Sequence, residues 1–272
     1  MRDLSAAQHS TAQQRRRRRQ HPSSSSSSSS SNTTTTTTIT IITIITTAAM
    51  PPDEQDDFEA AHVHAVYESI APHFSATRHS PWPLVSRFLR ALPPGAVGLD
   101  VGAGNGKYAP VNPALHLLAS DALFRATTVE WTNRTRRAEV LLADSLALPY
   151  RAACADFAIC IAVVHHLSTR PRRQRALAAL LRVLRPRGRA LVYVWALEQG
   201  SSSRRGWHAA CPQDALVPWV VRAKGGLPDQ TYHRYYHLYR EGELEEDVAA
   251  AGGVVCESGY ERDNWWVIFT TA

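Results

Sequence analysis

The sequence predicts an α/β fold: a doubly wound, mostly parallel sheet with helices on both faces. Three observations predict it. From about residue 58 onwards, short apolar runs alternate with stretches of helical periodicity. The run at 157–164 is apolar throughout, as expected for a strand that is buried on both faces of a parallel sheet. The run at 97–101 ends in glycines at 102, 104 and 106, a turn in which a ligand can lie against backbone N–H groups at the mouth of such a sheet.

The elements are expected in a regular order. Residues 58–70 have apolar side chains at helical spacing, and Pro72 is expected to end this first helix. A second helix is expected at 84–92, which a Pro-Pro-Gly sequence ends. The remaining helices are expected at 172–184 and 243–251, and the seven strands at 97–101, 115–120, 140–143, 157–164, 190–195, 254–260 and 265–270. Strands that alternate with helices before a closing strand pair predict the doubly wound sheet.

Two segments are expected to lack regular structure. Residues 1–57 contain five consecutive arginines, a serine run and Thr/Ile repeats, which predict a disordered low-complexity extension ahead of one domain at 58–272. A transit peptide is one alternative for the extension, and an untranslated upstream region with the start at Met50 is another. Residues 199–231 are rich in Ser, Gly, Pro and basic side chains and are expected to form a long loop insertion.

The charge distribution restricts where a nucleic acid could bind. Residues 1–50 hold six arginines and one acid, so they carry +5 of the net charge of +6. The domain itself is nearly neutral, and any nucleic-acid site on it must be a local patch. One such patch is expected in the long loop, at Arg204, Arg205, Arg222 and Lys224.

The cysteines and the hydropathy exclude several classes of protein. The four cysteines form no CxxC pair and have no matching histidines, so the sequence predicts neither a metal site nor a disulfide framework. A reducing, cytoplasmic location is expected, extending to the nucleus. No apolar stretch reaches the roughly 20 residues that span a bilayer, so no membrane partner is expected.

Three acids that end successive strands indicate the cofactor. Asp100, Asp121 and Asp144 would lie at the carboxyl ends of strands, where ligands bind in open α/β sheets. Asp121 suits the hydroxyls of a ribose, Asp144 with Ser145 an adenine amino group, and Asp100 a cationic sulfonium. This set favours S-adenosylmethionine over a dinucleotide, whose pyrophosphate needs another glycine spacing. The expected cofactor-binding residues are Asp100, Gly102, Gly104, Asn105, Gly106, Asp121, Asp144, Ser145 and Val163.

Four sequence blocks resemble a known family. They are IAPHFSATRHSPWP at 70–83, LDVGAGNGKY at 99–108, IAVVHHLSTRPRR at 161–173 with ALVYVWALEQ at 190–199, and YYHLYREGELEE through GYERDNWWVI at 235–268. With them the chain is similar to the eukaryotic tRNA wobble-uridine methyltransferases, class I Rossmann-like enzymes whose domain also occurs in a human AlkB-homologue tRNA enzyme. The resemblance covers nearly all of 58–272. It departs at Ala103, where the family has Cys, and at 122–137, where the family has a helix that helps to cradle the cofactor.

The resemblance implies methyl transfer from S-adenosylmethionine to the carboxylate of 5-carboxymethyluridine at the wobble position of a tRNA anticodon loop. That carboxylate is ionised at neutral pH, so the site has to position it and exclude water rather than supply a general base. His165 and then His166, which follow the fourth strand, and Arg78 are the expected catalytic residues. Aromatic and basic side chains interleave near the C-terminus, as they do on RNA-binding surfaces. The expected substrate-binding residues there are Tyr239, Arg240, Arg262, Asn264 and Trp265.

Two alternatives to this function remain open. One is methylation of a small carboxylic acid or another metabolite. The other is a catalytically impaired, methyltransferase-like RNA-binding protein, which the divergent stretch at 122–137 makes credible. The resemblance also implies a small zinc-binding activator subunit, which forms a heterodimer with the methyltransferase and covers apolar surface.

Overall fold

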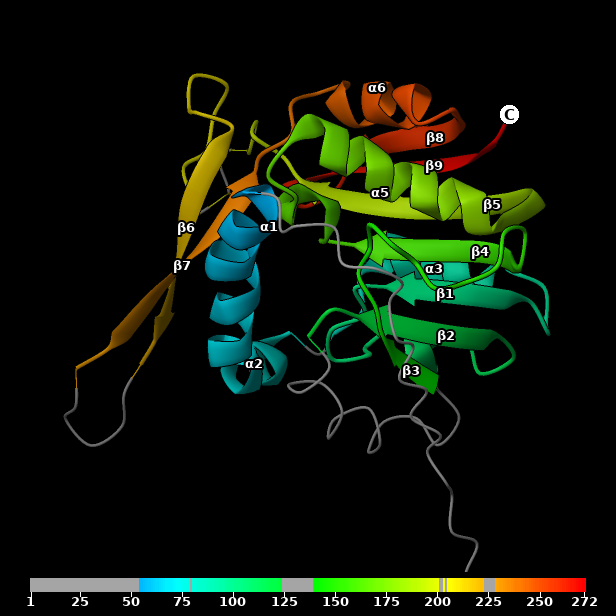
Figure 1. The fold of residues 1–272 in the computed structure, drawn as a ribbon, viewed down its shortest axis with the longest axis horizontal. Coiled ribbons are helices and arrows are strands. Elements are labelled where there is room, and N and C mark those ends of the chain that lie inside the picture. The colour runs from blue at the N-terminus through cyan, green and yellow to red at the C-terminus, as the bar shows by residue number, and fades with distance from the viewer. Residues whose placement is uncertain (1–53, 79, 124–138, 201–202, 204, 223–227) are drawn as a thin grey trace, which may run out of the picture. The chain divides into compact units, whose positions relative to one another are not determined.

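A computed structural model describes residues 54–78, 80–123, 139–200, 203, 205–222 and 228–272. Within these residues, seven strands form one sheet in the order β3-β2-β1-β4-β5-β9-β8 (Figure 1). The strands are β1 (Val97–Val101), β2 (His116–Asp121), β3 (Glu139–Leu142), β4 (Ala155–Ile161), β5 (Leu184–Trp195), β8 (Gly253–Tyr260) and β9 (Asn264–Thr271). The strands β1 to β5 pair in parallel, and β9 runs antiparallel to both β5 and β8. This arrangement confirms the predicted doubly wound, mostly parallel sheet.

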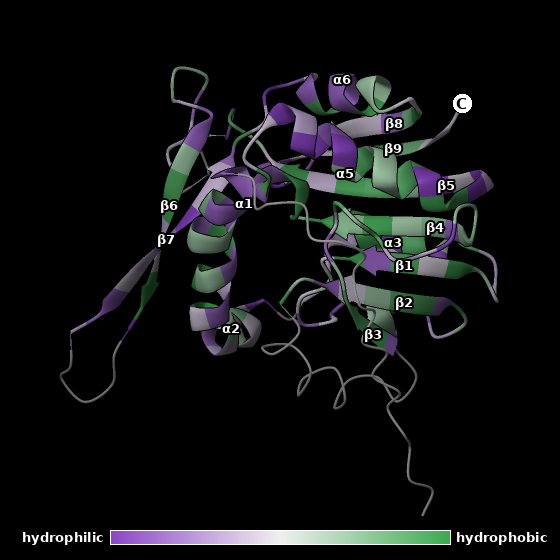
Figure 2. Ribbon diagram, viewed as in Figure 1, coloured by the Kyte–Doolittle hydropathy of each residue, from purple (hydrophilic) through white to green (hydrophobic). Residues whose placement is uncertain are grey.

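Helices cover both faces of the sheet because its central strands are apolar on both sides. Leu99, Ala158 and Val192 face the helices α5 (Arg170–Val183) and α6 (Glu243–Ala250), whereas Phe157 and Leu191 face α3 (Pro83–Arg90). Adjacent residues of β4 therefore enter opposite cores, as the pleat of a strand requires. Figure 2 shows the hydrophobic central strands and the more hydrophilic helices that pack on them.

One difference from the expected elements lies at the start of β5. The sequence around Pro186 predicts a turn before a strand at 190, but β5 begins at Leu184. Its first residues are irregular: the register with β4 shifts between Ala155 and Phe157, and Arg187 has a positive φ of 68°. The predicted turn and the irregular start of β5 are the same bend, and its hydrogen bonds make it part of the strand.

A second difference lies in the N-terminal helical segment, which continues past Pro72. It consists of α1 (Glu54–Glu59), the π-helical η1 (Ala60–His64) and α2 (Ala65–Thr77), so it begins ahead of the expected start at residue 58. The prediction that Pro72 ends the helix was wrong. A proline inside a helix removes one N–H bond and its ring crowds the carbonyl four residues earlier, at a cost of about 3 kcal/mol. The turn beyond it is held by packing: the ring of Phe74 lies 5.4 Å from that of Tyr67 and 5.6 Å from that of Trp219.

The largest difference is a β-hairpin where the sequence predicts a long loop at 199–231. The strands β6 (Asp214–Val221) and β7 (Gln230–His237) pair antiparallel over eight positions each. In β6 the inward positions include Val217 and Trp219, but the outward positions include Leu216 and Val220, which are 48% and 47% exposed. Because both faces are apolar, the alternation that identifies a half-buried strand is absent from the sequence. Pro218 points outward, which a two-stranded ribbon tolerates.

Several expectations lie outside the described residues. These are the low-complexity extension up to residue 53, the divergent stretch at 122–137 apart from its first two residues, and the loop residues Arg204 and Lys224. The four cysteines are unpaired thiols. In the part of the chain that the structure describes, no helix is both long and apolar enough to cross a membrane.

Candidate active site

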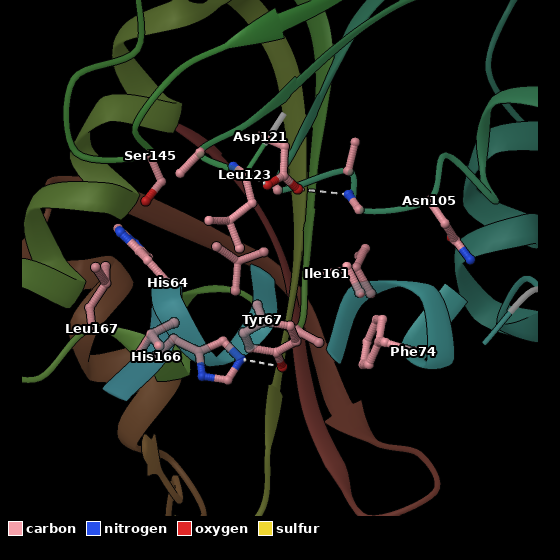
Figure 3. Close-up of a pocket in the computed structure, with 18 of the residues that line it drawn as sticks. His64, Tyr67, Phe74, Asn105, Asp121, Leu123, Ser145, Ile161, His166 and Leu167 are labelled. Atoms are coloured by element: carbon pink, nitrogen blue, oxygen red, sulfur yellow. Dashed lines mark hydrogen bonds between the residues drawn. The ribbon is translucent and has the colours of Figure 1, made fainter. Parts of the chain in front are cut away.

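A cavity of about 500 Å³ lies at the carboxyl ends of β1, β2 and β4. The N-terminal helical segment forms the wall opposite the sheet, and Tyr236 of the hairpin adds to it. Figure 3 shows Asp121 and Ser145 on one side of this cavity, with Tyr67, Phe74 and His166 across from them. The cavity thus stands where the topology of an open α/β sheet places a ligand.

The glycine turn after β1 leaves the backbone open toward the cavity. Gly102, Gly104 and Gly106 have positive φ angles of 72°, 54° and 69°, which side chains rarely adopt. A Cβ at Gly102 would lie 2.2 Å from the Cγ2 atom of Val163, so even alanine would clash there. Gly102, Gly104 and Val163 line the cavity, and Gly106 closes the turn through its N–H bond to the carbonyl of Ala103.

Asp121 presents its carboxylate to the cavity from the end of β2. Its Oδ2 accepts the N–H of Gly104 and its Oδ1 accepts the N–H of Leu123, each at 2.8 Å. Burial raises the pKa of Asp121, while these two N–H groups act in the opposite direction. Each carboxylate oxygen keeps a free lone pair, which is what recognition of two ribose hydroxyls needs.

Asp144, Ser145 and Asn105 also line the cavity, as the sequence predicts. The Oδ1 of Asp144 accepts the N–H of Leu146 at 2.8 Å, which fixes the loop after β3. The Nδ2 of Asn105 donates to the carbonyl of Arg78 at 3.3 Å. This hydrogen bond joins the glycine turn to the end of α2, and Arg78 at that end lines the cavity.

Asp100 and Lys107 form the charged floor of this side. Asp100 lies beneath the cavity surface, and its Oδ2 has no hydrogen-bond partner among the described residues. Burial raises the pKa of Asp100 to about 7, with Lys107 lowering it and Asp121 raising it further. Lys107 lines the cavity, and burial lowers the pKa of its amine to about 8. The site fits a cofactor that carries a ribose and a positive charge. Asp121 can accept the ribose hydroxyls, the unsatisfied carboxylate of Asp100 suits the charge, and the glycine turn leaves room beside the backbone.

The two adjacent histidines have different environments. His166 lines the cavity, whereas His165 is fully buried and turned away from it, which reverses the expected order of the pair. The Nδ1 of His165 accepts the N–H of Trp195 at 3.0 Å, so its Nε2 carries the proton and has no partner among the described residues. Its ring stacks on that of Tyr236, with centroids 4.8 Å apart. His165 therefore supports the cavity wall rather than touching a ligand.

His166 is a neutral ring in a fixed tautomer. Its Nδ1 lies 2.8 Å from the carbonyl of Tyr235 and must donate to it, so its Nε2 accepts the hydroxyl of Tyr67 at 3.0 Å. Burial lowers the pKa of His166 to about 3, assisted by the positive charge of Arg234. At neutral pH this side chain is uncharged and has both nitrogens engaged.

The hydroxyl of Tyr67 is the centre of a hydrogen-bond network. Because it donates to His166, its lone pairs must accept from its other neighbours, Tyr236 at 3.1 Å and the Nη1 of Arg234 at 3.1 Å. These four residues come from α2, β7 and the turn after β4. The network therefore joins three separate parts of the fold at the cavity wall.

Three arginines gather around the aromatic rings of this wall. The guanidinium of Arg78 lies 5.6 Å from the ring centres of both Phe74 and Trp219, and that of Arg234 lies 4.7 Å from the Trp219 ring. Arg205 stacks on Trp195 at 4.0 Å. Burial and the nearby charge of Arg78 lower the pKa of Arg205. We name Arg78, Arg205 and Arg234 the arginine cluster.

The residues expected to bind substrate do not line the cavity. Tyr239 is fully buried in the core beside Asp247, which corrects its expected surface role. Arg240 is exposed at the turn before α6. Arg262 and Asp263 have positive φ angles and form a two-residue hairpin turn between β8 and β9.

Asn264 and Trp265, the other two residues expected to bind substrate, instead make contacts that hold the fold together. Asn264 is buried and donates through Nδ2 to the carbonyls of Glu261 and Arg262, at 3.2 and 2.6 Å, which holds the hairpin turn. Trp265 packs on the core and against the ring of Tyr260, with centroids 4.9 Å apart. The polar and aromatic block therefore shapes a turn next to Trp195, which pairs with Asn264 across the strands and does line the cavity.

Sequence reasoning missed several residues at the site, among them Tyr67, Arg172 and Arg234. Tyr67 was expected only as part of an apolar helical face, and Arg172 had no assigned role, although it lines the cavity and pairs with Glu59 at 2.9 Å. Arg234 lies within the basic and aromatic stretch that contains Tyr235 and Tyr236. The alternation of aromatic and basic residues there was a usable signal, but it pointed to RNA contact and not to the cavity wall.

Comparison with known proteins identifies the relatives of this chain. Residues 99–192 match the family described as "Methyltransferase domain". Two solved structures share the fold: an S-adenosylmethionine-dependent methyltransferase from Clostridium acetobutylicum (TM-score 0.58, 11% identity, covering 76% of this chain and 99% of that one) and the CcbJ methyltransferase from Streptomyces caelestis (TM-score 0.58, 12% identity, covering 69% and 94%). At these identities they show the class I methyltransferase fold alone.

Curated relatives are much more similar in sequence. The tRNA (carboxymethyluridine(34)-5-O)-methyltransferase of Schizosaccharomyces pombe is 43% identical over 226 residues, covering 78% of this chain and 97% of the relative. The protein of the same name from Saccharomyces cerevisiae is 40% identical, covering 77% and 95%. The mouse ALKBH8 protein is 34% identical over 78% of this chain and 44% of its own length. On this similarity, which spans nearly the whole of two relatives, the chain belongs to the family of tRNA (carboxymethyluridine(34)-5-O)-methyltransferases.

Proposed function

We propose that this protein transfers a methyl group from S-adenosylmethionine to the carboxylate of 5-carboxymethyluridine at the wobble position of tRNA, giving 5-methoxycarbonylmethyluridine. The observation that carries the proposal is the separation of two charged groups at one cavity, with three acids at the strand ends and the arginine cluster at the aromatic wall. Asp56 and Glu59, which line the helical wall, are already paired with Arg172. Asp100, Asp121 and Asp144 lie on the sheet side, and the arginine cluster lies around the opposite wall. A cationic methyl donor suits the acidic side, and an anionic acceptor suits the basic side.

The reaction requires little acid–base chemistry from the protein. When bound, S-adenosylmethionine supplies an electrophilic methyl group. A carboxylate is ionised at neutral pH, so its oxygen attacks without losing a proton, and the products are a neutral ester and a neutral thioether. No side chain has to accept a proton, which agrees with a His166 whose nitrogens are both engaged and whose pKa burial lowers to about 3.

The side chains of the wall have two tasks: to orient the carboxylate and to keep water away. Arg78 lines the cavity and offers N–H groups that suit a carboxylate. Tyr67, Tyr236 and Trp195 line the same wall and exclude water from the reacting atoms. The hydrogen bonds around Tyr67 hold this wall rigid before the substrate arrives.

We propose that the hairpin contacts the anticodon loop. Arg222 is exposed directly after β6, Arg205 lies over the ring of Trp195, and the ring of Trp219 contacts both Arg78 and Arg234. Basic and aromatic side chains in this arrangement hold phosphates and stack on bases. Of the expected basic patch, Arg205 precedes the hairpin and Arg222 directly follows β6, and the other two residues lie outside the described part of the chain.

We also propose a heterodimer with a small zinc-binding activator subunit. The edge strand β3 supports it, because Leu142 on this edge is 62% exposed. Among the described residues β3 ends the sheet, and an edge strand with an exposed leucine is prone to pairing with another chain. The protein expressed alone is expected to aggregate and to become monodisperse on coexpression with the subunit; a monodisperse and active monomer would contradict the need for it.

A cytoplasmic location, extending to the nucleus, is part of the same proposal. Four unpaired cysteines suit a reducing compartment. A fluorescent fusion of the full chain tests it, and accumulation in another organelle would reject it.

The direct test of the function is incubation with labelled S-adenosylmethionine and tRNA that carries 5-carboxymethyluridine, with the activator subunit present. Base-labile label at the wobble nucleotide is expected, because an ester is hydrolysed by base. Label on free carboxylic acids without tRNA would favour a metabolite methyltransferase. Binding of tRNA without binding of S-adenosylmethionine, measured by calorimetry, would favour an impaired RNA-binding protein.

A further inference from the structure

Arg234 on β7 is a buried cation surrounded by aromatic rings. Its side chain is buried, with the residue only 2% exposed. The guanidinium carbon lies 4.7 Å from the ring centre of Trp219, 5.2 Å from that of Tyr236 and 5.4 Å from that of Tyr67. Faces of aromatic rings attract a cation, but more weakly than a carboxylate does.

Within the described residues, no carboxylate pairs with Arg234. Its one polar contact is the bond from Nη1 to the Tyr67 hydroxyl at 3.1 Å, and its Nε has no partner there. Two other arginines with little-exposed side chains, at 12% and 4%, do have carboxylate partners. Arg172 pairs with Glu59 at 2.9 Å, and Arg173, which is 4% exposed, lies 3.7 Å from Glu243.

A buried charge without a counter-ion is unfavourable, so its retention needs a reason. Arg78, which packs on the same Trp219 ring, also lacks an ion pair among the described residues. Arg205 has one, at 3.6 Å from Asp263. The arginine cluster therefore holds more positive charge than the acids beside it can neutralise, and this excess lies directly behind the wall that Tyr67 and Tyr236 form.

We propose that Arg234 is a positioning and specificity-determining residue, whose buried unpaired charge selects an anionic acceptor over its neutral carboxamide. The proposal rests on the proposed function, because it assumes that the acceptor is a carboxylate. Arg234 does not itself line the cavity; it acts through its field and through Tyr67. In a site with little water, a charge close behind the wall acts more strongly than one exposed to solvent.

The same charge has a consequence for turnover. The substrate carboxylate carries one negative charge and the ester product carries none. The product therefore loses the attraction of the arginine cluster at the moment it forms, and its release becomes easier. Arg234 thus favours binding of the substrate without favouring retention of the product.

A structural role for Arg234 predicts different results. If Arg234 only joined the hairpin to α2 through Tyr67, its replacement would weaken binding of charged and uncharged acceptors equally. If its charge selects the acceptor, the loss falls on the charged acceptor alone. A lysine at this position keeps the charge, although it lacks the planar group that lies over three rings.

The test is a binding measurement with the heterodimer and saturating S-adenosylhomocysteine. The probes are two anticodon stem-loop RNAs that differ only in carrying 5-carboxymethyluridine or 5-carbamoylmethyluridine, and the readout is the ratio of their dissociation constants. The wild type is expected to prefer the carboxylate by about tenfold or more. Arg234→Met is expected to lower the ratio several-fold by weakening the carboxylate RNA, with Arg78 keeping part of the preference, and Arg234→Lys is expected to restore most of it.

Arg189→Gln is the matched control, because Arg189 is an exposed arginine on β5 whose replacement removes one charge. Its ratio is expected to equal that of the wild type. Thermal unfolding and cofactor binding identify any variant that fails to fold. If Arg234→Met fails to fold, the ratios of dissociation constants measured for the wild type and for Arg234→Lys decide the question. A wild type without preference, an unchanged ratio in Arg234→Met, or equal losses for both RNAs would overturn the proposal. Methyl transfer is assayed separately, so a preference without transfer would reject the proposed function and keep anion selection.

Discussion

The two sides of the cavity are built in different ways. The acidic side consists of residues at or just after the carboxyl ends of β1, β2 and β3, and Asp121 and Asp144 accept backbone N–H groups from residues at most 17 positions away. The basic side joins α2, the turn after β4 and the hairpin, and its contacts link residues such as Tyr67 and Tyr236 that are 169 positions apart. The first side is therefore determined locally, while the second exists only in the folded molecule.

The comparison predicts that changes on the two sides affect different ligands, and Asp121 offers the largest expected effect. Asp121→Ala removes the acceptor of two ribose hydroxyls and leaves the N–H groups of Gly104 and Leu123 without their carboxylate. Affinity for S-adenosylmethionine is expected to fall roughly 10²- to 10³-fold, because hydrogen bonds to a charged group contribute about 1.5–3 kcal/mol each. Calorimetry measures it. Binding of tRNA without cofactor is expected to be unchanged; a parallel loss would mean that the two sides are not separate.

Arg78→Met tests the basic side, with a somewhat smaller expected effect. It removes one of the cations that line the cavity and keeps a side chain of similar length beside Phe74 and Trp219. The value of kcat/KM for tRNA is expected to fall about 30- to 100-fold, since a charge-assisted contact to a carboxylate is lost. Cofactor affinity is the control and is expected to stay constant. Weaker cofactor binding with a normal kcat/KM for tRNA would show that Arg78 serves the cofactor and not the acceptor.

The difference between the sides also explains how far the sequence could be interpreted. The acidic side was predictable because each of its acids lies within two residues of the end of a strand, and these strands lay within a few residues of their expected positions. The basic side was not, because no local pattern connects a tyrosine in the first helix to an arginine 167 positions later. Of the two adjacent histidines, only the folded chain shows which one faces the cavity.

The hairpin shows the second limit of sequence reasoning. Its outward residues Leu216 and Val220 are as apolar as its inward ones, so the strand has no amphipathic signature. Pro218 and the neighbouring basic residues further favoured a loop. Such exposed apolar residues contribute little to folding, and they are expected where a surface meets another molecule.

Tyr67→Phe separates the network from the charges. The variant keeps the ring but removes the hydroxyl that joins His166, Tyr236 and Arg234. The activation free energy of methyl transfer is expected to rise by about 1–2 kcal/mol, because the wall no longer holds the acceptor as well, and kcat falls about 5- to 30-fold. Cofactor affinity is expected to remain normal, and single-turnover kinetics measure the chemical step. An unchanged rate would show that the wall does not depend on this hydroxyl.

The acidic side should also give cofactor binding a pH dependence. Burial raises the pKa of Asp100 to about 7, so below that pH the carboxyl is neutral in the free protein. A cationic cofactor favours the ionised form, and its affinity is expected to rise about tenfold between pH 6 and pH 8. In Asp100→Asn the affinity is expected to be weaker and flat with pH. A wild-type affinity that is constant across this range would remove Asp100 from cofactor recognition.

The two sides should oppose each other in the stability of the cofactor-free protein. The folded pKa of Asp100 lies above its unfolded value of 3.8, so the folded state binds more protons between pH 4 and 7 and this contribution to stability declines as pH rises. His166 has the opposite sign, since its folded pKa of about 3 lies below 6.5: its contribution is lost as pH falls below 6.5. Each changes the free energy of unfolding by about 1 kcal/mol per pH unit. Denaturant unfolding between pH 4.5 and 6.5 should therefore show a steeper rise of stability with pH in Asp100→Asn and a shallower one in His166→Asn, and equal slopes in both variants would show that the two sides do not differ in this way.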